Sequence, residues 1–179
     1  MAGFKKESDA FAQFTIEGVT EFLREANRAD PKFKKEMQAA SRLVAKTVVA
    51  DLQTTAAGVR HETTGSMGAN SIYSRAARAL TASGGQVPTI YLRKGRFATK
   101  SRKRRKPVAV SDVFFGAEFG GRSRPTTRQF NPYRLAAGGR GGRGQFFWPT
   151  VQRDNRKIAN AYLAAVERVL RSLSGGPKN

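Results

Sequence analysis

The sequence contains no cysteine and a single histidine, His61. The absence of thiols excludes disulfides, thiolate nucleophiles and zinc–thiolate sites. His61 has no second histidine or cysteine with which to form a metal site, and it lies in the polar stretch Val59–Thr63. We therefore interpret His61 as a solvent-exposed loop residue, and we predict no metal ligand and no cofactor.

Long hydrophobic runs are also missing. Apolar residues make up 39% of the chain and the mean hydropathy is −0.51, so a good part of the chain is expected to lie outside the core. No apolar run approaches the roughly 18 residues that cross a bilayer. The N-terminus lacks the apolar centre of a secretory signal. We expect no membrane partner and a cytoplasmic protein.

Acidic residues are scarce after residue 60. Residues 61–179 hold five Asp and Glu against 23 Lys and Arg, whereas residues 1–60 hold eight against ten. The later part therefore carries +18 of the formal net charge of +20, and a charge of this size calls for an anionic partner. No two of the carboxylates after Glu62 form a recognisable acid/base pair or metal cluster. We predict no catalytic residue and expect the protein not to be an enzyme.

Several stretches have the apolar spacing of amphipathic helices. The pair Asp30-Pro31 predicts the start of the longest one, because Asp caps free backbone amides and Pro is tolerated in the first turn. The predicted helices run from Val19 to about Asp30, from Pro31 to Ala57, and from Trp148-Pro149-Thr150 to Ser174. Residues Ser71–Ala82 are assigned to a further helix, with a strand as the alternative.

Stretches rich in β-branched and aromatic residues predict three strands, Ala12–Ile16, Val87–Leu92 and Val108–Phe115. The expected fold class is α+β. A small antiparallel sheet is packed by the long central helix and the C-terminal helix, and two long basic loops project from this body.

One domain is expected over residues 1–179. Its core comprises 14–92 and 108–173, and its extended basic loops comprise 93–107 and 120–147. The second of these is far longer than the ordinary connections of a compact domain, so we expect it to be functional or to be disordered when alone.

The two loops concentrate the positive charge. Eleven Lys and Arg occur between Arg75 and Lys106 without one acid, and residues 122–143 combine Arg and Gly with aromatic residues. Such side chains fit the phosphates of a nucleic acid, and they equally fit an acidic neighbouring protein. The residues predicted to contact nucleic acid or another subunit are Lys100, Arg102, Lys103, Arg104, Arg105, Lys106, Arg122, Arg124, Arg128, Arg140 and Arg143. The predicted assembly anchors are Phe119, Phe130, Phe147 and Trp148.

Four short segments follow one another in a particular order. They are Phe14–Val19 before a helix, Thr63–Met67 followed by Ser71-Ile72, Val113–Gly120 as a strand that ends in Glu-Phe-Gly, and Gln129–Pro132 with Phe147–Val151 before the last helix. In kind and order they resemble the minor tail and neck proteins of long-tailed phages, the family that includes the tail completion protein Z of phage lambda. The resemblance covers most of residues 14–173, although the two basic segments here are larger than in the family.

The resemblance implies a structural protein of the virion, assembled in the host cytoplasm as a ring of six copies in the neck, where the head joins the tail. Its implied partners are copies of itself, neighbouring neck and tail proteins such as a head-side adaptor, a tail terminator or the tail tube, and packaged double-stranded DNA.

Two other hypotheses stay open. A sequence-independent nucleic-acid-binding protein would bind free nucleic acid with a steep salt dependence. A metal-dependent nuclease would lose turnover when Asp112 or Glu118 is changed, and we expect no turnover at all.

Overall fold

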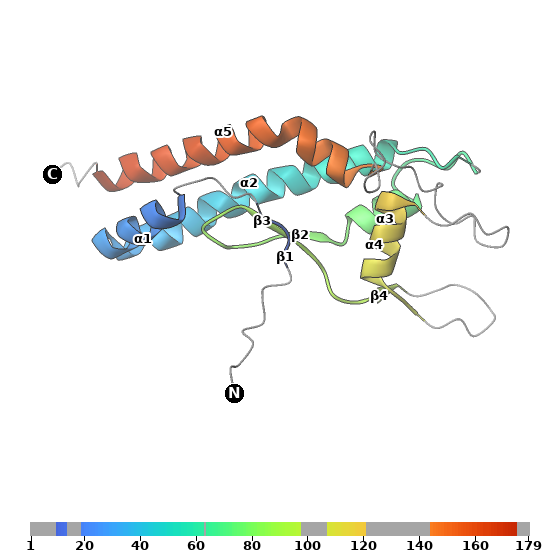
Figure 1. The fold of residues 1–179 in the computed structure, drawn as a ribbon, viewed down its shortest axis with the longest axis horizontal. Helices are drawn as coiled ribbons and strands as arrows, with labels where there is room; N and C mark the ends of the chain where they lie inside the picture. The colour runs from blue at the N-terminus through green and yellow to red at the C-terminus, as the bar shows by residue number, and fades with distance from the viewer. Residues whose placement is uncertain (1–9, 14–18, 63, 98–106, 121–143, 175–179) are drawn as a thin grey trace.

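The structure, a computed structural model, describes residues 10–13, 19–62, 64–97, 107–120 and 144–174. Two helices of 28 residues each, α2 (Pro31–Gly58) and α5 (Phe147–Ser174), lie side by side along its longest axis (Figure 1). Three further helices and two small antiparallel sheets complete the described part, so the predicted α+β class is confirmed. Within these residues, no helix combines the length and apolar character that crossing a membrane requires.

Helix α2 begins where the Asp30-Pro31 pair predicts. The Asp30 side chain accepts a hydrogen bond from the Lys32 amide at 2.7 Å, and Pro31 stands in the first turn, where no intrahelical donor is needed. One face of the helix is buried from Phe33 to Ala56, and the helix ends one residue beyond the predicted end. The cap and the apolar spacing therefore explain the central helix.

Helix α1 (Val19–Ala29) packs against the first part of α2. Helix α1, the first half of α2 and the second half of α5 form a small second core. This core joins the N-terminal end of α2 to the C-terminal end of α5 (Figure 1). The buried residues of that core are Leu23, Phe33, Met37, Tyr162 and Val169.

The main sheet has the strand order β1-β3-β2, with β1 (Ala10–Gln13), β3 (Thr89–Leu92) and β2 (Leu80–Ala82) all antiparallel to their neighbours. Helix α2 contacts β2 and β3, and Ile90 of β3 is fully buried in the main core. The predicted strand at 87–92 is confirmed in its second part. The predicted strand at 12–16 overlaps β1 in two residues, and its remaining positions lie outside the described residues.

Both alternatives for Ser71–Ala82 are realised in turn. A short helix, α3 (Ile72–Ala77), comes first, and strand β2 follows it. The Ser71 hydroxyl caps α3 by accepting a hydrogen bond from the Ser74 amide at 3.1 Å. The assignment of the whole stretch to a helix is therefore wrong for its last residues.

The turn between β2 and β3 ties three helices to the sheet through Gln86. Its backbone oxygen accepts hydrogen bonds from the Ser41 hydroxyl of α2 and from the Tyr162 hydroxyl of α5, the latter at 2.9 Å. Its side-chain amide exchanges two hydrogen bonds with Asn27 of α1, at 3.1 and 2.9 Å. The sheet is thus held at a fixed position along the helix pair.

The prediction of a strand over Val108–Phe115 is wrong. Only β5 (Val108–Ala109) is extended, and it pairs with β4 (Arg96–Phe97) in a separate two-stranded sheet. The residues that follow form helix α4 (Val110–Phe119). Burial of one helical face outweighs the strand preference of valine and phenylalanine here. The buried apolar positions have helical spacing: Val110, Val113, Phe114 and Ala117.

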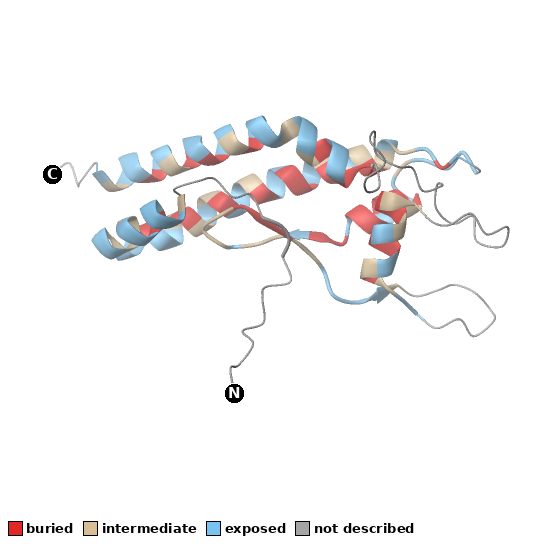
Figure 2. Ribbon diagram, in the orientation of Figure 1, coloured by how far each residue is buried: buried red, intermediate tan, exposed pale blue. Residues whose placement is uncertain are grey.

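The main core lies where α3, α4 and the first turns of α5 meet the second half of α2 (Figure 2). Its largest fully buried side chains include Tyr73, Phe114, Phe146 and Leu52. This end of the molecule is also where β4, β5 and α4 lie (Figure 1). The described functional candidates therefore adjoin the main core.

Candidate assembly surface

The structure describes only three of the predicted site residues, Phe119, Phe147 and Trp148. The predicted anchor Phe130 and all the predicted basic contact residues lie outside the described part of the chain. They are Lys100, Arg102, Lys103, Arg104, Arg105, Lys106, Arg122, Arg124, Arg128, Arg140 and Arg143.

The described residues next to the two basic segments all lie around α4. The β4–β5 pair, with Phe97 opposite Val108, brings together the two ends of the first segment, 98–106, at the start of α4. Gly120, directly after α4, and Gly144 bound the second segment, 121–143. Because α4 has 10 residues, the starting points of the two segments are separated by about 15 Å along that helix.

Glu118 fixes the end of α4 to the start of α5, the two helices that flank the second segment. It is fully buried, and its carboxylate accepts hydrogen bonds from the amides of Phe146, Phe147 and Trp148 at 3.0, 2.8 and 2.8 Å. These amides belong to the N-terminal end of α5, where free N–H groups and the helix dipole favour an anion. A carboxylate from the end of α4 therefore caps α5 and fixes α4 to it.

Gly144 allows this close approach. A Cβ atom at this position would lie 2.1 Å from a carboxylate oxygen of Glu118 and 2.8 Å from the Cβ of Trp148. Both distances are below any real carbon contact, so a side chain at residue 144 would displace either Glu118 or the start of α5.

Aromatic rings pack behind the capped end of α5. The Phe114 ring meets those of Phe146 and Phe147 edge to face, with centroid distances of 5.7 and 5.9 Å. The predicted anchor Phe147 is therefore a core residue that fixes α5 to α4, and its side chain does not face a partner.

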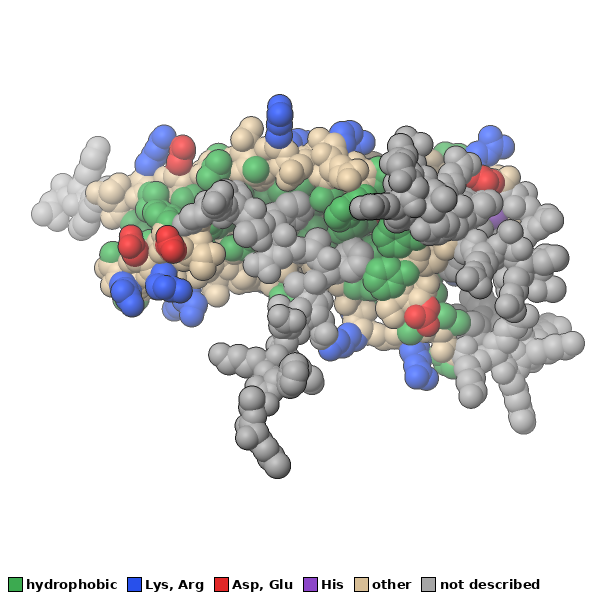
Figure 3. Space-filling view, in the orientation of Figure 1, with side chains coloured by type: hydrophobic (Ala, Val, Ile, Leu, Met, Phe, Trp, Pro, Cys, Tyr) green, Lys and Arg blue, Asp and Glu red, His purple; other side chains and the backbone are tan. Residues whose placement is uncertain are grey.

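Other aromatic side chains on this end of the molecule reach the surface. Trp148 is 48% exposed, and Phe115 is 43% exposed and stacks on the half-buried ring of Phe119 at 6.3 Å. Figure 3 shows hydrophobic side chains on this part of the surface. Phe115 and Phe119 form an aromatic pair on α4, and Trp148 is exposed separately at the start of α5. These residues lie near the ends of the basic segments, and aromatic residues of this kind are frequent at protein interfaces. Phe115 is a candidate that the sequence analysis missed.

His61 is not the solvent-exposed residue that the sequence predicts. It is 3% exposed, its Nδ1 accepts a hydrogen bond from the Thr64 amide at 3.2 Å, and its ring lies 6.3 Å from that of Tyr73. The Gly65 amide donates to the His61 carbonyl, and Gly65 has a φ of +65°, which glycine adopts most easily. The threonine-glycine turn therefore folds around a buried imidazole, and His61 has a structural place in it.

Within the described residues, no group of three or more His, Cys, Asp or Glu side chains could hold a metal ion. Asp112 is exposed in the first turn of α4, whereas both carboxylate oxygens of Glu118 accept backbone hydrogen bonds. Of the two acids named in the nuclease hypothesis, Asp112 is thus exposed to solvent, whereas Glu118 is buried and stabilises the fold.

The sequence matches no protein-family model, no curated protein and no solved structure. Function therefore has to follow from the residues and their geometry.

Proposed function

We propose that this protein is a structural subunit of the head-tail neck of a tailed phage, a tail completion or connector ring component that joins head and tail around the DNA channel. One observation carries the proposal. The two most basic segments of the chain both adjoin α4, at one end of the described structure, and the Glu118 cap joins the two helices that flank one of them.

The charge of these segments supports an assembly role. Residues 98–106 and 121–143 hold six Lys and Arg each and no acid, so they carry +12 of the net charge of +20. Two cationic segments on one end of each subunit give a ring many parallel contacts to neighbouring rings and to the phosphates of packaged DNA. Such contacts need no reading of sequence and no catalytic group.

The order of short motifs shared with phage neck and minor tail proteins supports the same proposal. The Thr64-Gly65 turn and the Trp148-Pro149 helix entry have defined structural places here. The Glu118-Phe119-Gly120 triplet ends a helix, in place of the strand that the resemblance implies. Each marks the fold, and none requires chemistry.

Electron microscopy and native mass spectrometry of the purified full chain test the proposal. We expect closed rings, with six copies as the expected number, and labelling of phage particles at the junction of head and tail. A chain that stays monomeric at high concentration and is absent from particles would contradict it.

The alternative is a sequence-independent nucleic-acid-binding protein, and the charge of +12 on the two basic segments also favours this function. It differs in a measurable way, because a monomer that neutralises several phosphates loses affinity steeply as salt rises. Replacing Arg102–Lys106 with glutamine would then weaken DNA binding uniformly across sequences. For the neck subunit, rings form in the absence of free DNA.

A further inference from the structure

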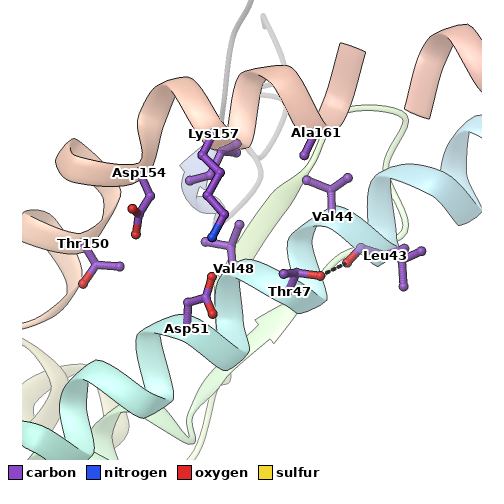
Figure 4. A pocket seen from close by; sticks show the side chains of 10 residues that line it. Leu43, Val44, Thr47, Val48, Asp51, Thr150, Asp154, Lys157 and Ala161 are labelled. Atoms are coloured by element: carbon purple, nitrogen blue, oxygen red, sulfur yellow. Dashed lines mark hydrogen bonds between the residues drawn. The ribbon is translucent and has the colours of Figure 1, made fainter. Parts of the chain in front are cut away.

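A groove runs between the two long helices on their solvent side (Figure 4). Its cavity volume is about 180 Å³, which is larger than the roughly 150 Å³ cavity that holds one benzene molecule in an engineered core. Helix α2 contributes Leu43, Val44, Thr47, Val48 and Asp51, and α5 contributes Thr150, Asp154, Lys157, Ile158 and Ala161.

Most of the groove surface is apolar and open. Leu43 at its edge is 61% exposed, and Val44, Val48 and Ile158 form the floor. Apolar surface left open between two well-packed helices is suited to a partner side chain. The space is large enough for one aromatic ring.

One end of the groove is polar and carries two carboxylates. Asp51 and Asp154 line it with a single cation, Lys157, whose side chain extends toward Asp51 (Figure 4). Asp154 already pairs with Arg153 at 2.7 Å, whereas Asp51 has no ion pair with any residue that the structure describes. With Arg153 counted, this end of the groove holds two carboxylates and two cations, so it is balanced in charge although the chain carries +20.

Thr150 adds a second observation at the same end. It is 2% exposed, and its hydroxyl oxygen has no hydrogen-bond partner within the described part of the chain. A buried hydroxyl without a partner is unfavourable, and because this oxygen is closed off from the surface, a partner group would reach it only if the Thr150 side chain turned toward the groove.

We propose that this groove receives residues 121–143 of a second copy of the chain, with an aromatic ring of Phe130 or Tyr133 on the apolar floor and a neighbouring arginine at Asp51. The inference rests on the proposed ring assembly and names one contact of it. Of the two basic segments, only 121–143 contains aromatic rings, because 98–106 holds six cations but no aromatic residue. The apolar floor and the Asp51 carboxylate together favour the segment that has both aromatic rings and arginines.

Because the natural chain has no cysteine, cross-linking between single-cysteine variants tests this contact directly. One variant carries Thr47→Cys, inside the groove. It is mixed with a second variant that carries Asn131→Cys and a tag that makes it distinguishable by size, and the mixture is treated with a short bis-maleimide. We expect a covalent product between the two kinds of copy. Two control pairs should give about tenfold less product: Glu167→Cys, exposed on α5 away from the groove, with Asn131→Cys, and Thr47→Cys with Thr99→Cys in the first basic segment.

Groove variants sharpen the test. Asp51→Asn removes the unpaired carboxylate, and Ala161→Phe fills the open groove from an exposed position. Each should reduce the Thr47–Asn131 product about fivefold, while Glu167→Gln leaves it unchanged. Thermal melts of each variant confirm that it is folded.

The outcomes separate this inference from the ring proposal. Rings in the micrographs with no Thr47–Asn131 product above the controls overturn the groove contact and leave the ring intact. The product without rings supports the groove contact between copies and contradicts the ring. A product of equal yield from the Thr99 pair overturns the choice of segment.

Discussion

The carboxylate of Glu118 accepts a hydrogen bond from the Phe147 amide at 2.8 Å, across 29 positions of sequence. The same carboxylate binds the two amides on either side of Phe147, so the last turn of α4 supplies the cap that α5 lacks in its own sequence. The buried Glu118 carboxylate therefore fixes the positions of the two helix ends that flank the segment between α4 and α5.

Replacing the Glu118 carboxylate should destabilise the contact between α4 and α5. In Glu118→Gln the side-chain NH₂ group faces backbone donors in place of one acceptor oxygen, and the charge that stabilises the helix N-terminus is lost. We expect the free energy of unfolding to fall by about 2–3 kcal/mol. Urea unfolding followed by circular dichroism measures it. Glu167→Gln, on the exposed surface of α5, is the matched control and should change stability by less than about 0.5 kcal/mol.

Gly144→Ala should act at the same place through sterics. The new Cβ would lie 2.1 Å from a Glu118 oxygen, so the cap must move, and we expect a loss of about 2 kcal/mol or more. Gly58→Ala is the control with the opposite sign, because no atom lies within 4 Å of its Cβ position at the end of α2. That change should stabilise the protein by about 0.5 kcal/mol. Equal melting temperatures for the two variants would contradict this account of Gly144.

The sequence predicts those elements whose signals are local. Asp30-Pro31 gives the start of α2, and the apolar spacing gives the course of α5. The error at 108–115 has a physical cause, since valine and phenylalanine favour strands while their spacing from Val110 to Ala117 is helical. The spacing was the better guide.

The candidate site could be predicted only in part, because its main contacts join distant residues. Glu118 and the first amide that it caps are 28 positions apart in the sequence, and nothing in the local sequence marks Glu118 as a cap. The groove depends on the packing of α2 against α5, so Asp51 and Thr150 come together only in the fold. Charge, by contrast, is a property of composition, and it identified both basic segments directly.

His61→Ala should destabilise the threonine-glycine turn. The change removes the acceptor of the Thr64 amide and leaves a cavity beside Tyr73, so we expect a loss of about 2 kcal/mol. Met67→Ala in the same loop is the control, because Met67 is mostly exposed and its loss should change stability by less than about 0.5 kcal/mol. If thermal denaturation gives the two variants the same midpoint, His61 is not part of the folded turn.

Tyr162 should make stability fall at alkaline pH. Burial raises the pKa of its hydroxyl above the ordinary value of 10.0, although the neighbouring Ser41 hydroxyl opposes the shift. As pH rises past 10.0 the unfolded chain loses this proton first, so the stabilisation is complete below that pH and is lost as pH rises through the folded-state pKa.

Tyr162→Phe separates this effect from the titration of the lysines. The variant loses the hydrogen bond to the Gln86 carbonyl, so near pH 8 its free energy of unfolding should be lower by about 1 kcal/mol. Between pH 9 and about 11 the natural protein should then lose stability more steeply than the variant, and the difference between them should shrink. Urea unfolding at a series of pH values measures both curves. Parallel curves over that whole range would show that Tyr162 keeps an ordinary pKa in the folded protein, and that the contact between α5 and the β2–β3 turn does not shield it from water.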